Sequence, residues 1–149
     1  MCDNIIRPAN VGSIFRLSDA FGVERLILGG PKIELNRKVW TTSRATEQVV
    51  DYEQVEDLKP LLLDYKKNGY TIIALEITTD SKPLSELKLD LERNIVLLTG
   101  SERYGINNDL LQYCDGIYHI EMYGQNSSMN VAQATSVALY EIIKWLSHA

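Results

Sequence analysis

Apolar residues gather in four short runs along the chain, and between these runs they recur every three or four positions. The runs span residues 24–28, 71–77, 94–98 and 116–122. The first three are compact and largely apolar, which is typical of parallel strands covered on both faces. Four strands are predicted from this pattern.

Helical spacing predicts helices between these strands. The first begins after Asn10, a favourable N-cap residue, and Gly22 suits its C-terminal end. Asp57 caps a second helix with apolar residues at 58, 61, 62 and 65, and Asn107 caps a short third one. Strands that alternate with helices predict an α/β fold, with a largely parallel sheet flanked by helices, in one domain over residues 1–149.

Three segments depart from a simple alternation. The last predicted helix, residues 130–146, is apolar almost all round, so we expect it to pack on the sheet and also against a second subunit. Residues 31–47 are polar without clear periodicity and are predicted to form a long loop, of the kind that is often functional or mobile. Only ten residues precede the first predicted helix, so a first strand there is either very short or truncated.

Composition is that of an ordinary globular protein, with 45% hydrophobic and 23% charged residues. Two cysteines, Cys2 and Cys114, are too few for a disulfide framework, and Cys114 is expected to be a small buried apolar residue. No apolar run is long enough to span a bilayer and no secretory signal is visible, so we expect a cytoplasmic protein without membrane contact.

The net charge of −5 argues against strong nucleic-acid binding, but the charge is unevenly distributed. Residues 1–50 carry seven Lys and Arg against five Asp and Glu, whereas the remainder is strongly acidic. The positive end is either an RNA-binding surface or a set of scattered, solvated charges.

Three segments offer candidate chemistry, each with a plainer alternative. In residues 10–22, Arg16 faces away from the apolar stripe and beside Gly12 and Ala20; it is either functional or merely solvated. In residues 98–105, a strand ends in a turn around Glu102, without the spacing of a dinucleotide or phosphate loop. That turn is either a ligand site or only a tight connection.

The third segment, residues 118–141, has a strand, a small polar loop and a helix in succession. Ligands of α/β proteins bind at such junctions. Ser127, Ser128 and Asn130 stand near the start of the helix, where plain capping is the alternative. No metal-ligand spacing and no catalytic triad is recognisable.

Together the three segments resemble the motifs of the SpoU (TrmH-like) family of RNA 2′-O-ribose methyltransferases, within the SPOUT superfamily. The first motif is matched by Asn10, Gly12, Arg16, Phe21 and Gly22. The second is matched by Gly100, Glu102 and Gly105. The third is matched by Ile120, Met122, Gly124, Ser128, Asn130, Val131 and Ala134. The resemblance covers essentially the whole chain, but Glu121 stands where the family has proline and Met129 where it has leucine.

The resemblance implies a sheet whose C-terminal part forms a deep trefoil knot, and a homodimer with its active site between subunits. It also implies methyl transfer from S-adenosylmethionine to a ribose 2′-OH of tRNA or rRNA, with S-adenosylhomocysteine as product and no metal. No separate N-terminal RNA-binding extension is visible, which favours tRNA slightly. The cofactor residues implied are Thr99, Gly100, Ile120, Met122, Ser128 and Met129, and Glu121 is expected to alter cofactor affinity.

Arg16 is the residue to which the resemblance assigns the chemistry. Since an arginine normally stays protonated, we expect it to bind RNA phosphate and stabilise the developing alkoxide rather than act as a base. The supporting hydrogen-bonding residues would be Asn10, Glu102, Ser128 and Asn130. Candidates for RNA binding are Arg7, Arg37, Lys38 and Arg44. Two alternatives stay open: a non-catalytic RNA-binding module, and a nucleotide-dependent α/β oxidoreductase.

Overall fold

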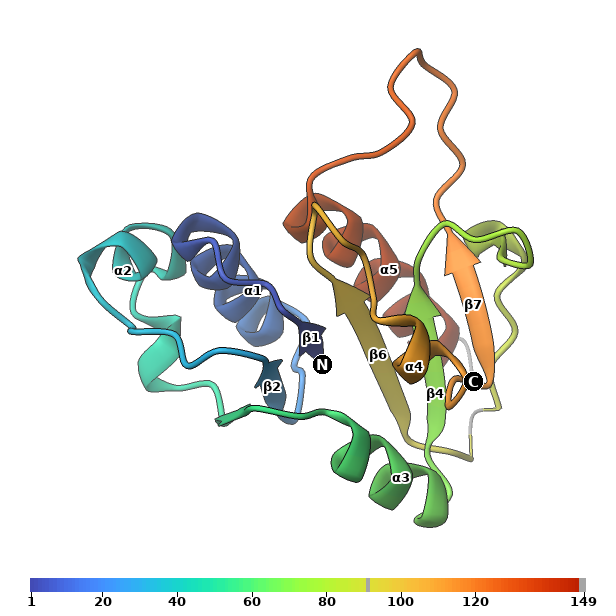
Figure 1. Ribbon diagram of the computed structural model, residues 1–149, viewed down its shortest axis with the longest axis horizontal. Coiled ribbons are helices and arrows are strands. Elements are labelled where there is room, and N and C mark those ends of the chain that lie inside the picture. Colours follow the sequence, from blue (N-terminus) through green and yellow to red (C-terminus); the bar gives the residue numbers. More distant parts are fainter. Residues whose placement is uncertain (91, 148–149) are drawn as a thin grey trace.

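A computed structural model describes residues 1–90 and 92–147. Within them, one parallel sheet of seven strands has the order β3-β2-β1-β6-β4-β7-β5 (Figure 1). The strands are β1 (Cys2–Asp3), β2 (Leu26–Gly29), β3 (Tyr52–Val55), β4 (Thr71–Leu75), β5 (Lys82–Pro83), β6 (Ile95–Gly100) and β7 (Gly116–His119). The prediction of a largely parallel α/β sheet is confirmed.

Helices connect these strands and cover both faces of the sheet. They are α1 (Pro8–Ala20), α2 (Arg37–Ser43), α3 (Lys59–Lys67), α4 (Asn108–Leu111) and α5 (Val131–Ser147), with 3₁₀ turns η1 (Thr46–Gln48) and η2 (Leu84–Glu86). Alternation along β2 shows the two faces: Leu26 and Leu28 pack with α1 and α5, whereas Ile27 packs with α3. The sheet is therefore the middle layer of three, and α1, α2 and α5 share one side.

All four predicted strands are present, and two further strands, β3 and β5, were not predicted. β1 and β5 have two residues each, too few to produce an apolar run. β3 lies at the edge of the sheet and is largely exposed, so its sequence lacks the apolar character used to find strands. The expectation of a very short first strand is met by β1, which lies between β2 and β6.

The start of the first helix was predicted wrongly. α1 begins at Pro8, with Arg7 as its N-cap, because proline suits the first turn of a helix. Asn10 therefore lies inside the helix and is only 7% exposed. Gly22 follows the last turn with a φ of +62°, which confirms its place at the helix end.

Of the two other predicted caps, one is confirmed and the other lies one residue before the N-cap of its helix. Asn107 accepts a hydrogen bond from the Asp109 N–H at 3.0 Å and caps α4. Asp57 accepts one from the Lys59 N–H at 2.9 Å, and α3 begins at that lysine.

The prediction that residues 31–47 form a loop is wrong, because they include α2 and the start of η1. Asn36 caps α2 by accepting a hydrogen bond from the Lys38 N–H at 3.0 Å. The helix is short and lies directly against Gly12 of α1, where a Cβ atom would come within 2.4 Å of the Val39 carbonyl oxygen. The sequence of α2 lacks the regular apolar spacing of an amphipathic helix, so its stability comes from its contact with α1.

The prediction that the final helix, α5, packs on the sheet is confirmed. Ala138 and Ile142 pack on the sheet beside Ile73. Its other side carries large exposed apolar residues, namely Val137, Tyr140, Ile143, Trp145 and Leu146. Among the described residues, no helix has the length and apolar character needed to cross a membrane.

Candidate functional site

A hydrogen bond joins the first and third candidate segments. Asn130, just before α5, donates through Nδ2 to Oδ1 of Asn10 in α1 at 3.0 Å. The Oδ1 atom of Asn130 accepts from the Ala132 N–H at 2.9 Å. Asn130 is therefore both a helix cap and a link between two segments that lie 120 residues apart.

The amide of Asn10 keeps one unused donor beside this link. Its Nδ2 atom is buried and has no hydrogen-bond partner among the residues that the structure describes. Leaving a buried donor unpaired costs about 1–3 kcal/mol. Such a donor can be satisfied by an oxygen atom of a ligand that enters the adjoining cleft.

The cleft lies between α1, α2 and the start of α5 and has a volume of about 760 Å³. Asn10, Arg16, Arg44 and Asn130 line it together with small and hydroxyl-bearing residues, namely Ala9, Ser13, Leu17, Ala20, Thr41, Thr42, Ala132, Gln133 and Ser136. Two arginines without a carboxylate among the lining residues make the cleft electropositive. A polyanion such as RNA fits this character.

Arg44 adopts an unusual backbone conformation at the end of α2. Its φ and ψ are +55° and +43°, and the next residue, Ala45, has a φ of +69°. For residues other than glycine, the left-handed region costs about 1–2 kcal/mol each. Strained backbone of this kind occurs preferentially at functional sites, and here it places an arginine in the cleft.

The second candidate segment, residues 98–105, forms a tight turn, which is the plainer of the two interpretations given for it. Ser101 and Gly105 pair across the turn, and Glu102 lies exposed on it. A Cβ atom at Gly100 would lie 2.1 Å from the carbonyl carbon of Gly105, so this approach requires glycine. Glu102 does not line the cleft that contains Arg16.

The third segment leaves the sheet after β7 and projects beyond it before returning to α5 (Figure 1). Ile120, Met122 and Met129 are half-buried and Ser128 is exposed. Among the residues that the structure describes, no hydrogen-bond partner is found for residues 122–129, so their backbone N–H and C=O groups are available to a ligand. Ser128 lies outside the arginine cleft.

The residues assigned to the cofactor lie along one edge of the sheet. Thr99 and Gly100 end β6, and residues 120–129 follow β7; both strands neighbour β4 and run parallel to it. Their carboxyl ends therefore lie on the same edge, where α/β proteins hold ligands. The Thr99 hydroxyl already donates to Sγ of Cys2 at 3.8 Å, so the backbone supplies the free groups here.

Glu121, the departure from the family pattern, has a partner of its own. Its Oε2 atom accepts a hydrogen bond from the Ser85 hydroxyl at 3.1 Å, and it is exposed. The pairing joins the loop after β7 to η2.

The four candidate RNA-binding residues do not lie together. Arg44 lines the cleft, whereas Arg37 and Lys38 are exposed in the first turn of α2 and Arg7 precedes α1. Thr41, Thr42, Gln133 and Ser136 also line the cleft and were not predicted. The polar sequence did not predict α2, so nothing in the sequence indicated that residues 41 and 42 line the same cleft as Arg16.

Burial makes the thiol of Cys114 unreactive. Its side chain is half-buried against an apolar cluster, and burial, aided by Asp115, raises its pKa to about 11. Burial also raises the pKa of Cys2. Since the thiolate is the nucleophile, both groups are neutral and inert near pH 7. We therefore expect iodoacetamide to modify the native chain slowly at pH 7 and the urea-unfolded chain rapidly, as followed by mass spectrometry; equal rates would contradict the burial.

These features define a parallel α/β protein with an electropositive cleft and a ligand loop at the carboxyl edge of its sheet. The chain belongs to the SpoU rRNA Methylase family, whose sequence profile matches residues 1–140. Among the described residues, no group of three or more His, Cys, Asp or Glu side chains could hold a metal ion.

Two curated relatives and one solved structure illustrate the likeness. A tRNA (guanosine(18)-2'-O)-methyltransferase from Aquifex aeolicus is 30% identical over 142 residues, which are 93% of this chain and 65% of that protein. The 23S rRNA (guanosine-2'-O-)-methyltransferase RlmB of Pseudomonas aeruginosa is 29% identical over 143 residues, 95% of this chain and 56% of that protein. The crystal structure of the A. aeolicus TrmH/SpoU tRNA modifying enzyme matches with a TM-score of 0.87 and 29% identity, covering 99% of this chain and 74% of that one. The chain thus spans less than two thirds of either curated relative.

Proposed function

We propose that the chain transfers a methyl group from S-adenosylmethionine to a ribose 2′-OH of structured RNA, either tRNA or rRNA. The observation that carries the proposal is the Asn130–Asn10 hydrogen bond, which joins the first and third family motifs beside Arg16 in an electropositive cleft. The printed names of the A. aeolicus and P. aeruginosa relatives support the reaction and leave both RNA classes open.

The chain's own residues would bind and position the RNA. The Arg16 guanidinium binds a phosphate next to the target ribose and stabilises negative charge that develops on O2′. The unpaired Nδ2 group of Asn10 donates a hydrogen bond to a second RNA oxygen. When bound, S-adenosylmethionine supplies the methyl group for an in-line displacement in which the O2′–C bond forms, the C–S bond breaks, and the hydroxyl proton passes to solvent.

The backbone around the ends of β6 and β7 would hold the cofactor. Gly100, Ile120 and Met129 contribute backbone groups. Thr99, Met122 and Ser128 are close to these residues in the sequence. The support is the run of unpaired backbone groups in residues 122–129. In this arrangement Glu121 would add a negative charge to the segment that holds the positively charged cofactor.

Two observations support a homodimer with its active site between subunits. The exposed apolar residues of α5 form a surface suited to a second copy. Glu102 and Ser128 are exposed and lie outside the cleft of their own chain, so a second copy would be required to bring such residues to Arg16.

A trefoil knot is supported by the order of the strands. β5 follows β4 in sequence, yet β7, a much later strand, lies between them in the sheet. The segment that connects β4 to β5 therefore passes round the position of β7. A knot in which the C-terminal part of the chain threads through this connecting segment would require such a path.

The test of the proposed function is a map of 2′-O-methylation. RNA from cells that lack the protein would be compared with RNA from the same cells carrying either the wild-type gene or Arg16→Ala, using resistance of the methylated phosphodiester to alkaline cleavage. One or more sites should disappear and return only with the wild-type gene. If no site changes and calorimetry detects no S-adenosylmethionine binding, the alternative of a non-catalytic RNA-binding module, which the cleft also supports, takes its place.

Replacement of Arg44 by glycine separates its role in RNA binding from its role in folding. Glycine adopts the left-handed conformation freely, so we expect the free energy of unfolding to stay equal or rise by about 1 kcal/mol at most. RNA affinity should fall, with the salt dependence reduced by about one phosphate contact. Ala45→Gly is the matched control, since it relieves the strain of a similar left-handed backbone conformation without removing a charge. Unchanged RNA affinity in Arg44→Gly would remove this residue from the binding surface.

A further inference from the structure

A cavity with aromatic walls lies beside α2, on a different side of that helix from the cleft. Its volume is about 500 Å³, within the range of small-ligand sites. Residues of α2, η1, β3 and the adjoining segments line it, namely Leu35, Trp40, Ala45, Glu47, Gln48 and Tyr52. Trp40 is 51% exposed and Tyr52 36%, so both are accessible to a ligand. We call this space the aromatic cavity.

Both aromatic side chains of the cavity belong to elements that are fixed by other contacts. Tyr52 begins β3, and its ring meets that of Phe15 edge to face, with the centroids 5.0 Å apart. Trp40 lies in α2, which packs closely on Gly12 of α1. A preformed aromatic surface of this kind binds a planar ring with little loss of side-chain freedom.

Glu47 gives the aromatic cavity a carboxylate with an unused oxygen. Its side chain is half-buried, and its Oε2 atom accepts a hydrogen bond from the hydroxyl of the buried Ser43. Among the described residues, Glu47 forms no ion pair and its Oε1 atom has no hydrogen-bond partner. Such a carboxylate favours a ligand that donates hydrogen bonds.

Gln48 adds a free amide beside this carboxylate. Its backbone N–H donates to the Ala45 carbonyl at 3.1 Å, but within the described part of the chain its side-chain amide has no partner. The aromatic cavity thus combines aromatic side chains with a carboxylate and an amide. Proteins use these groups to stack an unpaired RNA base and to read its edge.

α2 brings the aromatic cavity and the cleft to one continuous surface. Thr41 and Thr42 line the cleft, whereas Trp40 lines the aromatic cavity. Arg37 is exposed and precedes Trp40 by three positions, so the two side chains are neighbours on the surface of α2. An RNA strand bound in the cleft can therefore cross α2, contact Arg37 through a phosphate and place a base in the aromatic cavity.

We propose that the aromatic cavity binds one unpaired guanine base of the RNA, on a nucleotide other than the one that is methylated. The inference rests on the proposed function for RNA as the substrate, and it adds a determinant of which RNA is chosen. The base stacks on Trp40, and its N1–H and N2–H groups donate to the two carboxylate oxygens of Glu47. The Gln48 amide donates to O6 of the same base.

The carboxylate of Glu47 selects guanine over the other bases. Guanine alone presents two neighbouring donors, N1–H and N2–H, on its Watson–Crick edge, and a carboxylate accepts both. Adenine and cytosine present one amino donor beside a ring acceptor, and uracil presents one donor between two carbonyl oxygens. An acceptor opposite a carboxylate is repelled, so these bases are rejected. The same negative charge repels phosphate and keeps the RNA backbone at Arg37.

The test measures binding of short RNAs through the fluorescence of Trp40. Trp145→Phe leaves Trp40 as the only tryptophan of the chain, and a base that stacks on it quenches its emission. In low-salt buffer without cofactor, the pentanucleotide UUGUU should quench it saturably. UUAUU, UUCUU and UUUUU should bind at least about tenfold more weakly. The inosine pentanucleotide, which lacks only the N2 amino group, should bind with intermediate affinity.

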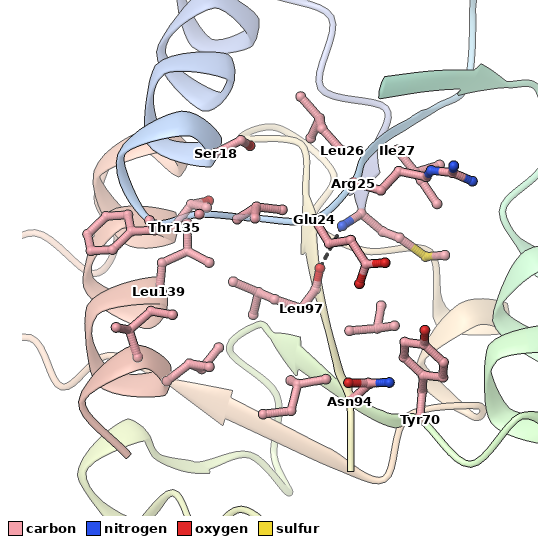
Figure 2. A pocket seen from close by; sticks show the side chains of 18 of the residues that line it. Ser18, Glu24, Arg25, Leu26, Ile27, Tyr70, Asn94, Leu97, Thr135 and Leu139 are labelled. Atoms are coloured by element: carbon pink, nitrogen blue, oxygen red, sulfur yellow. Dashed lines mark hydrogen bonds between the residues drawn. The ribbon is translucent and has the colours of Figure 1, made fainter. Parts of the chain in front are cut away.

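Variants of the cavity residues show where the base binds. Glu47→Gln keeps an acceptor for Ser43 but offers guanine only one acceptor, so UUGUU and UUAUU should bind equally. Glu24→Gln is the matched control, because it removes the same charge from a different cavity of about 500 Å³, where Figure 2 shows Glu24 beside Arg25. It should keep the preference for guanine. Trp40→Ala should weaken binding of labelled UUGUU about tenfold, as measured by fluorescence anisotropy.

Guanosine monophosphate distinguishes a base within RNA from a free nucleotide. It should bind at least about tenfold more weakly than UUGUU, because it lacks the flanking phosphates. The proposal is overturned if the pentanucleotides bind equally, if none quenches Trp40, if Glu47→Gln keeps the preference, or if the free nucleotide binds as tightly as UUGUU. The inosine comparison needs no change at Glu47 and keeps the test valid if Glu47→Gln fails to fold.

The binding test and the methylation map fail independently. Pentanucleotide binding needs neither the cofactor nor Arg16, so a preference for guanine without any methylated site would contradict methyl transfer and leave the aromatic cavity as an RNA-binding site. Methylated sites without a preference for guanine would overturn the aromatic cavity alone.

Discussion

Replacing Arg16 by alanine is expected to reduce the rate of RNA methylation by about 100-fold to 1,000-fold, the loss that follows removal of one group that stabilises transition-state charge. Affinity for S-adenosylmethionine should stay the same, because Arg16 lies in the cleft between α1, α2 and α5 rather than at the carboxyl edge of β6 and β7. Single-turnover methylation and calorimetry with the cofactor measure the two quantities separately.

Two further variants make this result specific. Arg16→Lys keeps the charge but loses the planar pair of donors, so its rate should lie between those of the wild type and Arg16→Ala. Lys67→Ala removes an equal charge from the end of α3, on the opposite face, and should leave the rate unchanged. If Arg16→Ala lowers cofactor affinity as much as turnover, the assignment of Arg16 to the RNA and the alkoxide is wrong.

Replacing Gly12 by alanine is expected to destabilise the chain by about 2–3 kcal/mol, through overpacking of α1 against α2. Helix propensity alone predicts the opposite, a gain of about 1 kcal/mol. The added Cβ atom would lie 2.4 Å from the Val39 carbonyl oxygen and 2.9 Å from the Ser43 nitrogen, which are backbone atoms and cannot rotate away. The free energy of unfolding in urea measures the change.

Two other glycines provide controls for this result. Gly22→Ala meets no atom within 4 Å but has a φ of +62°, so we expect a loss of about 1 kcal/mol from the backbone alone. Gly124→Ala also meets no atom within 4 Å, has no such conformation, and should be neutral. A Gly12→Ala variant that is more stable than the wild type would show that α2 moves freely, and the cleft shared by Arg16 and Arg44 would then have no fixed shape.

A displaced α2 would also change function, since Thr41, Thr42 and Arg44 line the cleft. The stability and RNA affinity of Gly12→Ala should therefore fall together, in contrast to Arg44→Gly, where only affinity falls. This contrast distinguishes a glycine that supports the site from an arginine that binds within it.

Most of the architecture was predictable from local pattern. Buried parallel strands are apolar along their length, and β2, β4, β6 and β7 were found for that reason. β3 was missed because an edge strand needs no such run, and α2 was missed because its stability comes from contact with Gly12 rather than from an apolar stripe. Arg7, rather than Asn10, begins α1 because Pro8 fits the first turn, and this change moves Asn10 from a cap to a buried position.

The sequence by itself determined the order of four strands and four helices, the three motifs with their family resemblance, and the separation of the basic first third from an acidic remainder. These properties depend on residue type and spacing along the chain. Only the tertiary structure decided that Asn130 contacts Asn10 and that Arg44 joins Arg16 in one cleft. Each depends on how segments far apart in the sequence meet, which spacing along the chain does not specify.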